Sequence, residues 1–122
     1  MQVKAPATRA GIEALRGPQD DVVAMVAEFR QRCEYFVAGL NTVRGFRCNL
    51  PAGAFYAFAN IRDTGLDSKT MEDRLLREAG VAALSGASFG RSGEGYIRFS
   101  VANSLDRLME AVQRMRRFFG EV

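Results

Sequence analysis

The chain has 122 residues, of which 48% are hydrophobic and 25% charged, values typical of a single globular domain with its own core. No apolar run approaches the roughly 20 residues that a membrane-spanning helix needs, and no secretory leader is visible, so we expect a cytoplasmic protein. The net charge of +3 comes from arginines scattered over several segments, which argues against a nucleic-acid-binding surface.

A short helix is predicted at the start of the chain, after an irregular lead-in. Thr8 can cap a helix that runs to about Arg16, and Gly17-Pro18 can end it, because glycine closes helices and proline cannot continue them. We expect Ile12 and Leu15 to face inward. The segment therefore predicts an amphipathic helix packed against the core.

The longest predicted helix begins after Asp20 or Asp21 and ends near Leu40. Its apolar residues recur at spacings of three and four, which is typical of one broad buried stripe. We interpret the stripe as core and not as a binding face. It consists of Val22, Val23, Met25, Val26, Phe29, Cys33, Phe36, Val37 and Leu40.

Two strands are predicted in the middle of the chain. Phe46 to Leu50 forms a short one, and the turn at Pro51 to Gly53 favours an antiparallel hairpin. Ala54 to Ile61 is apolar on both faces. A strand of this kind is usually central and covered on both sides.

A helix capped by Asp67 or Ser68 follows, and Gly80 is expected to end it in the left-handed conformation. Val81 to Leu84 is predicted as a short strand, and Ser85 to Gly95 as a glycine-rich loop. The helix residues expected in the core are Met71, Leu75, Leu76 and Ala79.

The next strand carries a charge in its middle. Tyr96, Arg98 and Ser100 point to one face, while Ile97, Phe99 and Val101 point to the other and are expected in the core. Arginine presents a planar fork of donors that suits a carboxylate or a phosphate. The alternative is an ordinary arginine on the wet face of a strand.

The last helix is capped by Asn103 or Ser104. The order of elements predicts one α+β domain over residues 1–122, with helices packed against a small antiparallel or mixed sheet of three to four strands. The apolar stripe of this helix consists of Leu105, Leu108, Met109, Val112, Met115 and Phe119.

Several chemistries are disfavoured by what the chain contains. It has no histidine, the commonest general base and transition-metal ligand. Cys33 and Cys48 lie outside any metal-ligand spacing, so no metal site is predicted. A disulfide between them is possible, and we favour free buried thiols.

Five local patterns, taken in order, resemble the C-terminal small domain of class I/II aminotransferases, the pyridoxal-phosphate enzymes of the aspartate aminotransferase type. The resemblance covers nearly the whole chain, from about Thr8 to the last helix. One departure is visible, because the family commonly has proline at the position of Ser85. The patterns are Ala14–Asp20, Pro51–Tyr56, Glu78–Ala82, Ser85–Gly90 and Gly93–Ser100.

The resemblance implies roles for individual residues. Arg98 matches the arginine that binds the α-carboxylate of the amino-acid substrate. Phe55 matches a position near the active-site wall, although a simple core role is equally compatible. Tyr96 and Ser100 share the face of Arg98 and are expected to support it. No residue of this chain is expected to be catalytic.

The resemblance also implies parts that the chain lacks. The Schiff-base lysine and the groups that hold pyridoxal phosphate belong to a larger preceding domain, and Lys4 and Lys69 resemble plain surface lysines. We therefore expect a fragment of a homo-oligomeric enzyme, inactive and without bound cofactor when alone, that exposes an apolar former interface. The alternatives are a stand-alone carboxylate- or amino-acid-binding module and, from charge alone, a nucleic-acid-binding domain.

Overall fold

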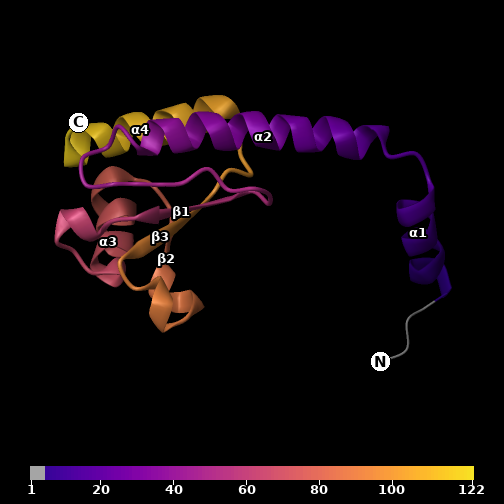
Figure 1. Ribbon diagram of the computed structural model, residues 1–122, viewed down its shortest axis with the longest axis horizontal. Helices are drawn as coiled ribbons and strands as arrows, with labels where there is room; N and C mark the ends of the chain where they lie inside the picture. Colours follow the sequence, from indigo (N-terminus) through magenta and orange to yellow (C-terminus); the bar gives the residue numbers. More distant parts are fainter. Residues whose placement is uncertain (1–4) are drawn as a thin grey trace.

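The computed structural model describes residues 5–122 and confirms an α+β fold, with a small antiparallel sheet beside long helices (Figure 1). None of the described helices has the length and hydropathy needed to cross a bilayer. The helices and strands are α1 (Ala5–Arg16), α2 (Asp20–Leu40), β1 (Tyr56–Asn60), α3 (Ser68–Arg74), β2 (Leu84–Ser85), β3 (Tyr96–Ser100) and α4 (Leu105–Phe119).

The sheet has the order β1-β3-β2, and both strand pairs are antiparallel. Arg98 stands in the central strand, opposite Phe58 of β1 on one side and Leu84 of β2 on the other. These three side chains share one face of the sheet, because directly opposed residues point the same way. We call it the open face; its residues are Tyr56, Phe58, Asn60, Leu84, Tyr96, Arg98 and Ser100.

The other face of the sheet forms the core. Ile97 and Phe99 of β3 are at most 2% exposed, as predicted, and Phe36 of α2 packs edge-on against Phe99 with ring centres 5.4 Å apart. Helices α2 and α4 lie side by side over this face (Figure 1). Cys33 and Cys48 are free thiols in the same core, and burial raises the pKa of each.

Helix α3 begins and ends as predicted. The Asp67 carboxylate accepts a hydrogen bond from the backbone N–H of Thr70 at 2.8 Å, so Asp67 is the cap. A π-helical turn, Leu75–Ala79, continues the helix to Gly80, which adopts the left-handed conformation. Met71 and Leu75 are buried, but the prediction for Leu76 was wrong, since its side chain points into solvent.

The predictions for the strands in the middle of the chain were partly wrong. Phe46 to Leu50 forms no strand, and only Arg47 makes an isolated bridge to Asn60, so the hairpin at Pro51 to Gly53 is absent. The strand within Ala54 to Ile61 is an edge strand, and its outward aromatic side chains are exposed. Within Val81 to Leu84 only the last residue is in a strand, β2.

The predicted burial of the first helices was also wrong. Helix α1 starts before Thr8, so Thr8 lies inside it, and Ile12 and Leu15 are exposed. In α2 the apolar stripe is buried only from Cys33 onward, because the first half of the helix projects beyond the sheet (Figure 1). The exposed part of that stripe is Val22, Val23, Met25 and Val26.

Candidate functional site

Arg98 lies in the middle of β3 with its side chain on the open face, where it is half-buried. Its guanidinium carbon lies 4.3 Å from the ring centre of Tyr56 and 4.0 Å from that of Phe89. Tyr56 comes from β1, and Phe89 comes from the loop between β2 and β3. The guanidinium is therefore in cation–π contact with two aromatic rings from separate segments.

The polar edge of the same guanidinium has no partner among the residues that the structure describes. Among residues 5–122, no carboxylate lies within 4.0 Å of Arg98 and no hydrogen bond reaches its side chain. The donors of a guanidinium point outward in its own plane. Arg98 thus offers an unpaired positive fork to an anion that approaches the open face.

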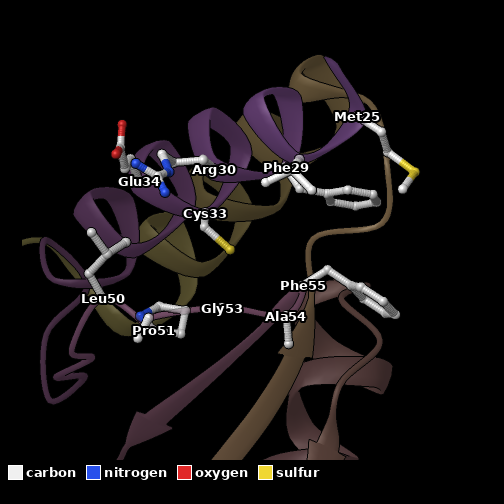
Figure 2. A pocket seen from close by; sticks show the side chains of 12 residues that line it. Met25, Phe29, Arg30, Cys33, Glu34, Leu50, Pro51, Gly53, Ala54 and Phe55 are labelled. Carbon is white, nitrogen blue, oxygen red and sulfur yellow. The ribbon is translucent and has the colours of Figure 1, made fainter. Parts of the chain in front are cut away.

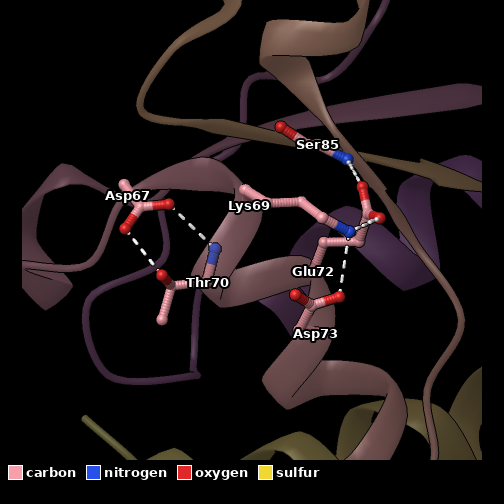
Figure 3. Close-up of polar contacts among 6 residues, drawn as sticks. All are labelled: Asp67, Lys69, Thr70, Glu72, Asp73 and Ser85. Carbon is pink, nitrogen blue, oxygen red and sulfur yellow. Dashed lines mark hydrogen bonds and ion pairs between the residues drawn. The ribbon is translucent and has the colours of Figure 1, made fainter.

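The loop between β2 and β3 is fastened to α3 at both ends. At its start, the Ser85 N–H donates to a Glu72 carboxylate oxygen at 2.5 Å (Figure 3). At its end, the Gly95 N–H donates to the buried Ser68 hydroxyl at 2.8 Å, and the Ser68 N–H donates to Glu94 at 2.9 Å. Hydrogen bonds with charged acceptors are among the stronger ones in proteins, so α3 fixes this loop on the sheet.

The loop is also closed upon itself by two glycines. A Cβ atom at Gly93 would lie 2.0 Å from the carbonyl oxygen of Gly86, and one at Gly86 would lie 2.2 Å from that of Gly93. Real Cβ atoms do not approach backbone atoms so closely, so only glycine fits at either position.

Phe55, the second predicted site residue, precedes β1 and contacts Phe29 of α2, with ring centres 5.5 Å apart. It lines a hollow of about 510 Å³ between α2 and the segment Leu50–Phe55 (Figure 2). Arg98 does not line this hollow, but Phe55 and Arg98 both contact the ring of Tyr56. The structure therefore brings the two predicted residues to one aromatic side chain.

Lys69 does not have the surroundings of a Schiff-base lysine. Its ammonium donates to Glu72 at 2.8 Å and to Asp73 at 2.9 Å (Figure 3). Hydrogen bonds to Glu72 and then Asp73 raise the pKa of Lys69, whereas a nucleophilic amine needs a lowered pKa. The other lysine, Lys4, lies outside the described residues. Lys69 is therefore a surface lysine held by two carboxylates.

The aromatic partners of Arg98 were not predicted from the sequence. Tyr96 stacks on Phe58, with ring centres 5.2 Å apart, and the Ser100 hydroxyl accepts a hydrogen bond from the Ala102 N–H. Neither makes a hydrogen bond or a cation–π contact with the guanidinium; the rings that do are those of Tyr56 and Phe89. The alternation of one strand cannot show which residues of other segments lie beside it.

The sequence matches the family profile of aminotransferase class I and II over residues 1–115. The chain belongs to this family. It is 43% identical to putative aminotransferase YugH of Bacillus subtilis over 97% of this chain and 30% of that protein. It is 41% identical to an aspartate aminotransferase of Pyrococcus horikoshii over 88% of this chain and 28% of that protein.

A solved aminotransferase structure shares the fold. An alanine aminotransferase from Pyrococcus furiosus superposes with a TM-score of 0.90 at 30% identity, over 95% of this chain and 30% of that one. The chain thus spans under a third of the length of the aminotransferases that it matches. The family predicted from the five sequence patterns is therefore confirmed.

Proposed function

We propose that the chain acts as the C-terminal small domain of a pyridoxal-phosphate-dependent aminotransferase, and that Arg98 binds the α-carboxylate of the amino-acid or 2-oxo-acid substrate. The observation that carries this proposal is the unpaired guanidinium on the open face of the sheet. A surface arginine without this role would more often lie extended in solvent or pair with a nearby carboxylate.

Arg98 acts in this proposal by binding and orienting. Two parallel N–H···O bonds to a carboxylate fix both the position and the plane of the acid group. A hydrogen bond to a charged group contributes about 1.5–3 kcal/mol. Correct placement of the bound molecule lowers the entropy that must be lost on the way to the transition state. Phe55, at the rim of the neighbouring hollow, supplies an apolar wall.

Pyridoxal phosphate chemistry belongs, in this proposal, to a part of the enzyme other than this chain. The cofactor supplies an electron sink for the amino-group transfer. The ion pairs of Lys69 do not suit it for attachment, so no step is assigned to that residue. The chain by itself is therefore expected to be inactive.

Two apolar surfaces fit a role inside a larger enzyme. The open face carries the half-exposed rings of Tyr56 and Phe58, and α1 with the first half of α2 exposes a second set of apolar side chains. Contiguous exposed apolar surface commonly marks an interaction site. We propose that the large domain of the enzyme and a second subunit of a homo-oligomer pack against these surfaces.

The experiment that tests the proposal compares wild type with Arg98→Lys in the complete aminotransferase that carries this chain. Lysine keeps the charge but loses the fork, so kcat/KM should fall about 10- to 100-fold. Unchanged kinetics would show that Arg98 does not bind the substrate carboxylate.

A second experiment uses the 122-residue chain alone. Mixed with pyridoxal phosphate, it should show no aldimine absorbance band and no turnover. Stoichiometric cofactor retention with turnover would refute the proposal that the chain works only as part of a larger enzyme.

A stand-alone carboxylate-binding module is the second candidate, because the Arg98 fork has no partner among residues 5–122. Calorimetric titration of the 122-residue chain with dicarboxylic amino acids separates the two functions. A small domain that works only within a larger enzyme gives negligible heat. Saturable binding abolished by Arg98→Lys would favour the module.

A further inference from the structure

The two rings beside Arg98 differ in what else they do. Tyr56 also contacts Phe55 and so belongs to an aromatic chain that leads to α2. Phe89 contacts no other aromatic ring among the described residues, and 51% of its surface is exposed. A large apolar side chain that is half in water contributes little to the core. Its one close aromatic–cation contact is with Arg98, at 4.0 Å.

The placement of Phe89 is determined by the backbone around it. It ends the 3-10 turn Gly86–Phe89, inside the loop that the contact between Gly86 and Gly93 closes. The same loop is tied to α3 through the Ser85 N–H and the Ser68 hydroxyl. A loop fastened at both ends and closed in the middle presents its ring at a fixed position above β3.

We propose that Phe89 is a positioning residue: together with Tyr56 it holds the Arg98 guanidinium between two rings, so that its donor edge faces the carboxylate of a ligand at the open face. We call this arrangement of Tyr56, Arg98 and Phe89 the sandwich. The contact with a ligand rests on the proposed function, whereas the sandwich itself does not. Without the two flanking rings, an arginine side chain samples many rotamers and must lose that freedom when it binds a carboxylate.

The flanking rings leave the binding edge of the guanidinium free. Aromatic faces attract the cation from above and below its plane, while the N–H donors lie within the plane. Rings whose centres lie 4.3 and 4.0 Å from the guanidinium carbon leave less room for water beside it, which strengthens the attraction to an anion at the edge. Preorganisation of this kind raises affinity without adding a contact to the ligand.

The first test uses nuclear magnetic resonance of the 122-residue chain. In wild type, the Arg98 side-chain protons should be shifted upfield by ring currents, and their signals assigned by their loss in Arg98→Lys. Phe89→Leu should move these signals toward those of exposed arginines, and Phe89→Tyr should retain the shift. Phe58→Leu is the matched control, because Phe58 lies opposite Arg98 but stacks on Tyr96. Unshifted Arg98 signals in wild type, or no change in Phe89→Leu, would overturn the sandwich.

The second test measures kinetics in the complete aminotransferase. Phe89→Leu should raise the KM of the amino-acid substrate roughly 3- to 10-fold with kcat changed less than 2-fold, and Phe89→Tyr should restore the wild-type KM. If Arg98→Lys impairs the enzyme while Phe89→Leu keeps the wild-type KM, the positioning role is wrong. If Arg98→Lys has no effect, the proposed function is wrong, whatever the magnetic resonance result for the sandwich.

Discussion

Replacement of Gly93 by alanine should destabilise the folded state, because the added Cβ atom would clash with the backbone of Gly86. The added Cβ would lie 2.0 Å from the Gly86 carbonyl oxygen and 2.4 Å from its carbonyl carbon, so the two backbone segments must separate by at least about 1 Å. Overpacking of this kind costs about 1–3 kcal/mol. A backbone shift also strains the hydrogen bonds at the loop ends, each of which contributes about 1 kcal/mol or more. We therefore expect a loss of roughly 2–4 kcal/mol.

Urea unfolding followed by circular dichroism measures this loss. With a slope of about 2 kcal/mol per molar urea, the midpoint should fall by about 1–2 M. Gly53→Ala is the matched control, because no atom lies within 4 Å of the Cβ that it would add. That variant should stay within about 0.5 kcal/mol of wild type.

The substitution can also unfold only the loop between β2 and β3 while the core stays folded. In that case the midpoint changes little, but the amide of Gly95, which donates to the buried Ser68 hydroxyl, exchanges its hydrogen much faster. If Gly93→Ala matches Gly53→Ala in both the unfolding midpoint and the exchange of that amide, the close contact of the two glycines is not what fixes the loop.

Two further predictions concern α3 and the exposed helix surface. A hydrogen bond from Lys69, and after it the Ser85 N–H, lowers the pKa of Glu72 from its ordinary value of 4.5. A carboxylate with a lowered folded-state pKa stabilises the fold fully above that ordinary value and loses its contribution as the pH falls through the folded value. The free energy of unfolding, measured in urea between pH 6 and 2, should therefore fall less steeply in Glu72→Gln; parallel profiles would contradict this. Val23→Glu places a charge in the exposed apolar stripe of α2. It should leave the free energy of unfolding within about 0.5 kcal/mol of wild type and reduce self-association in sedimentation at high concentration. Equal sedimentation of the two proteins would show that this stripe does not mediate association.

Most helix ends and the central strand were predictable because local chemistry determines them. The cap at Asp67, the left-handed Gly80 and the alternation around Arg98 all depend on residues within a few positions of one another. Burial was predicted less well. An apolar stripe shows that a face avoids water, but not which surface covers it. Leu15 of α1 and Val22 and Val23 of α2 belong to such stripes and remain exposed.

The site was predictable only in part, for a similar reason. Arg98 could be singled out because a cation in the middle of a strand is unusual and because the flanking residues resemble a known family. Its aromatic partners could not, since Tyr56 reaches Arg98 through strand register and Phe89 through the fold of a loop. Both depend on contacts between segments distant in sequence. The edge position of β1 has the same origin, since it depends on which strands pair with β3.

The most direct test of the central claim is a double-mutant cycle between Arg98 and the substrate carboxylate in the complete aminotransferase. Wild type and Arg98→Ala are each assayed with an amino-acid substrate and with its α-carboxamide, which has similar shape but no charge. We predict a coupling free energy in kcat/KM of about 1.5–3 kcal/mol, because removing either partner loses the same charge-assisted hydrogen bonds. Additive effects, with a coupling near zero, would show that Arg98 does not bind the carboxylate.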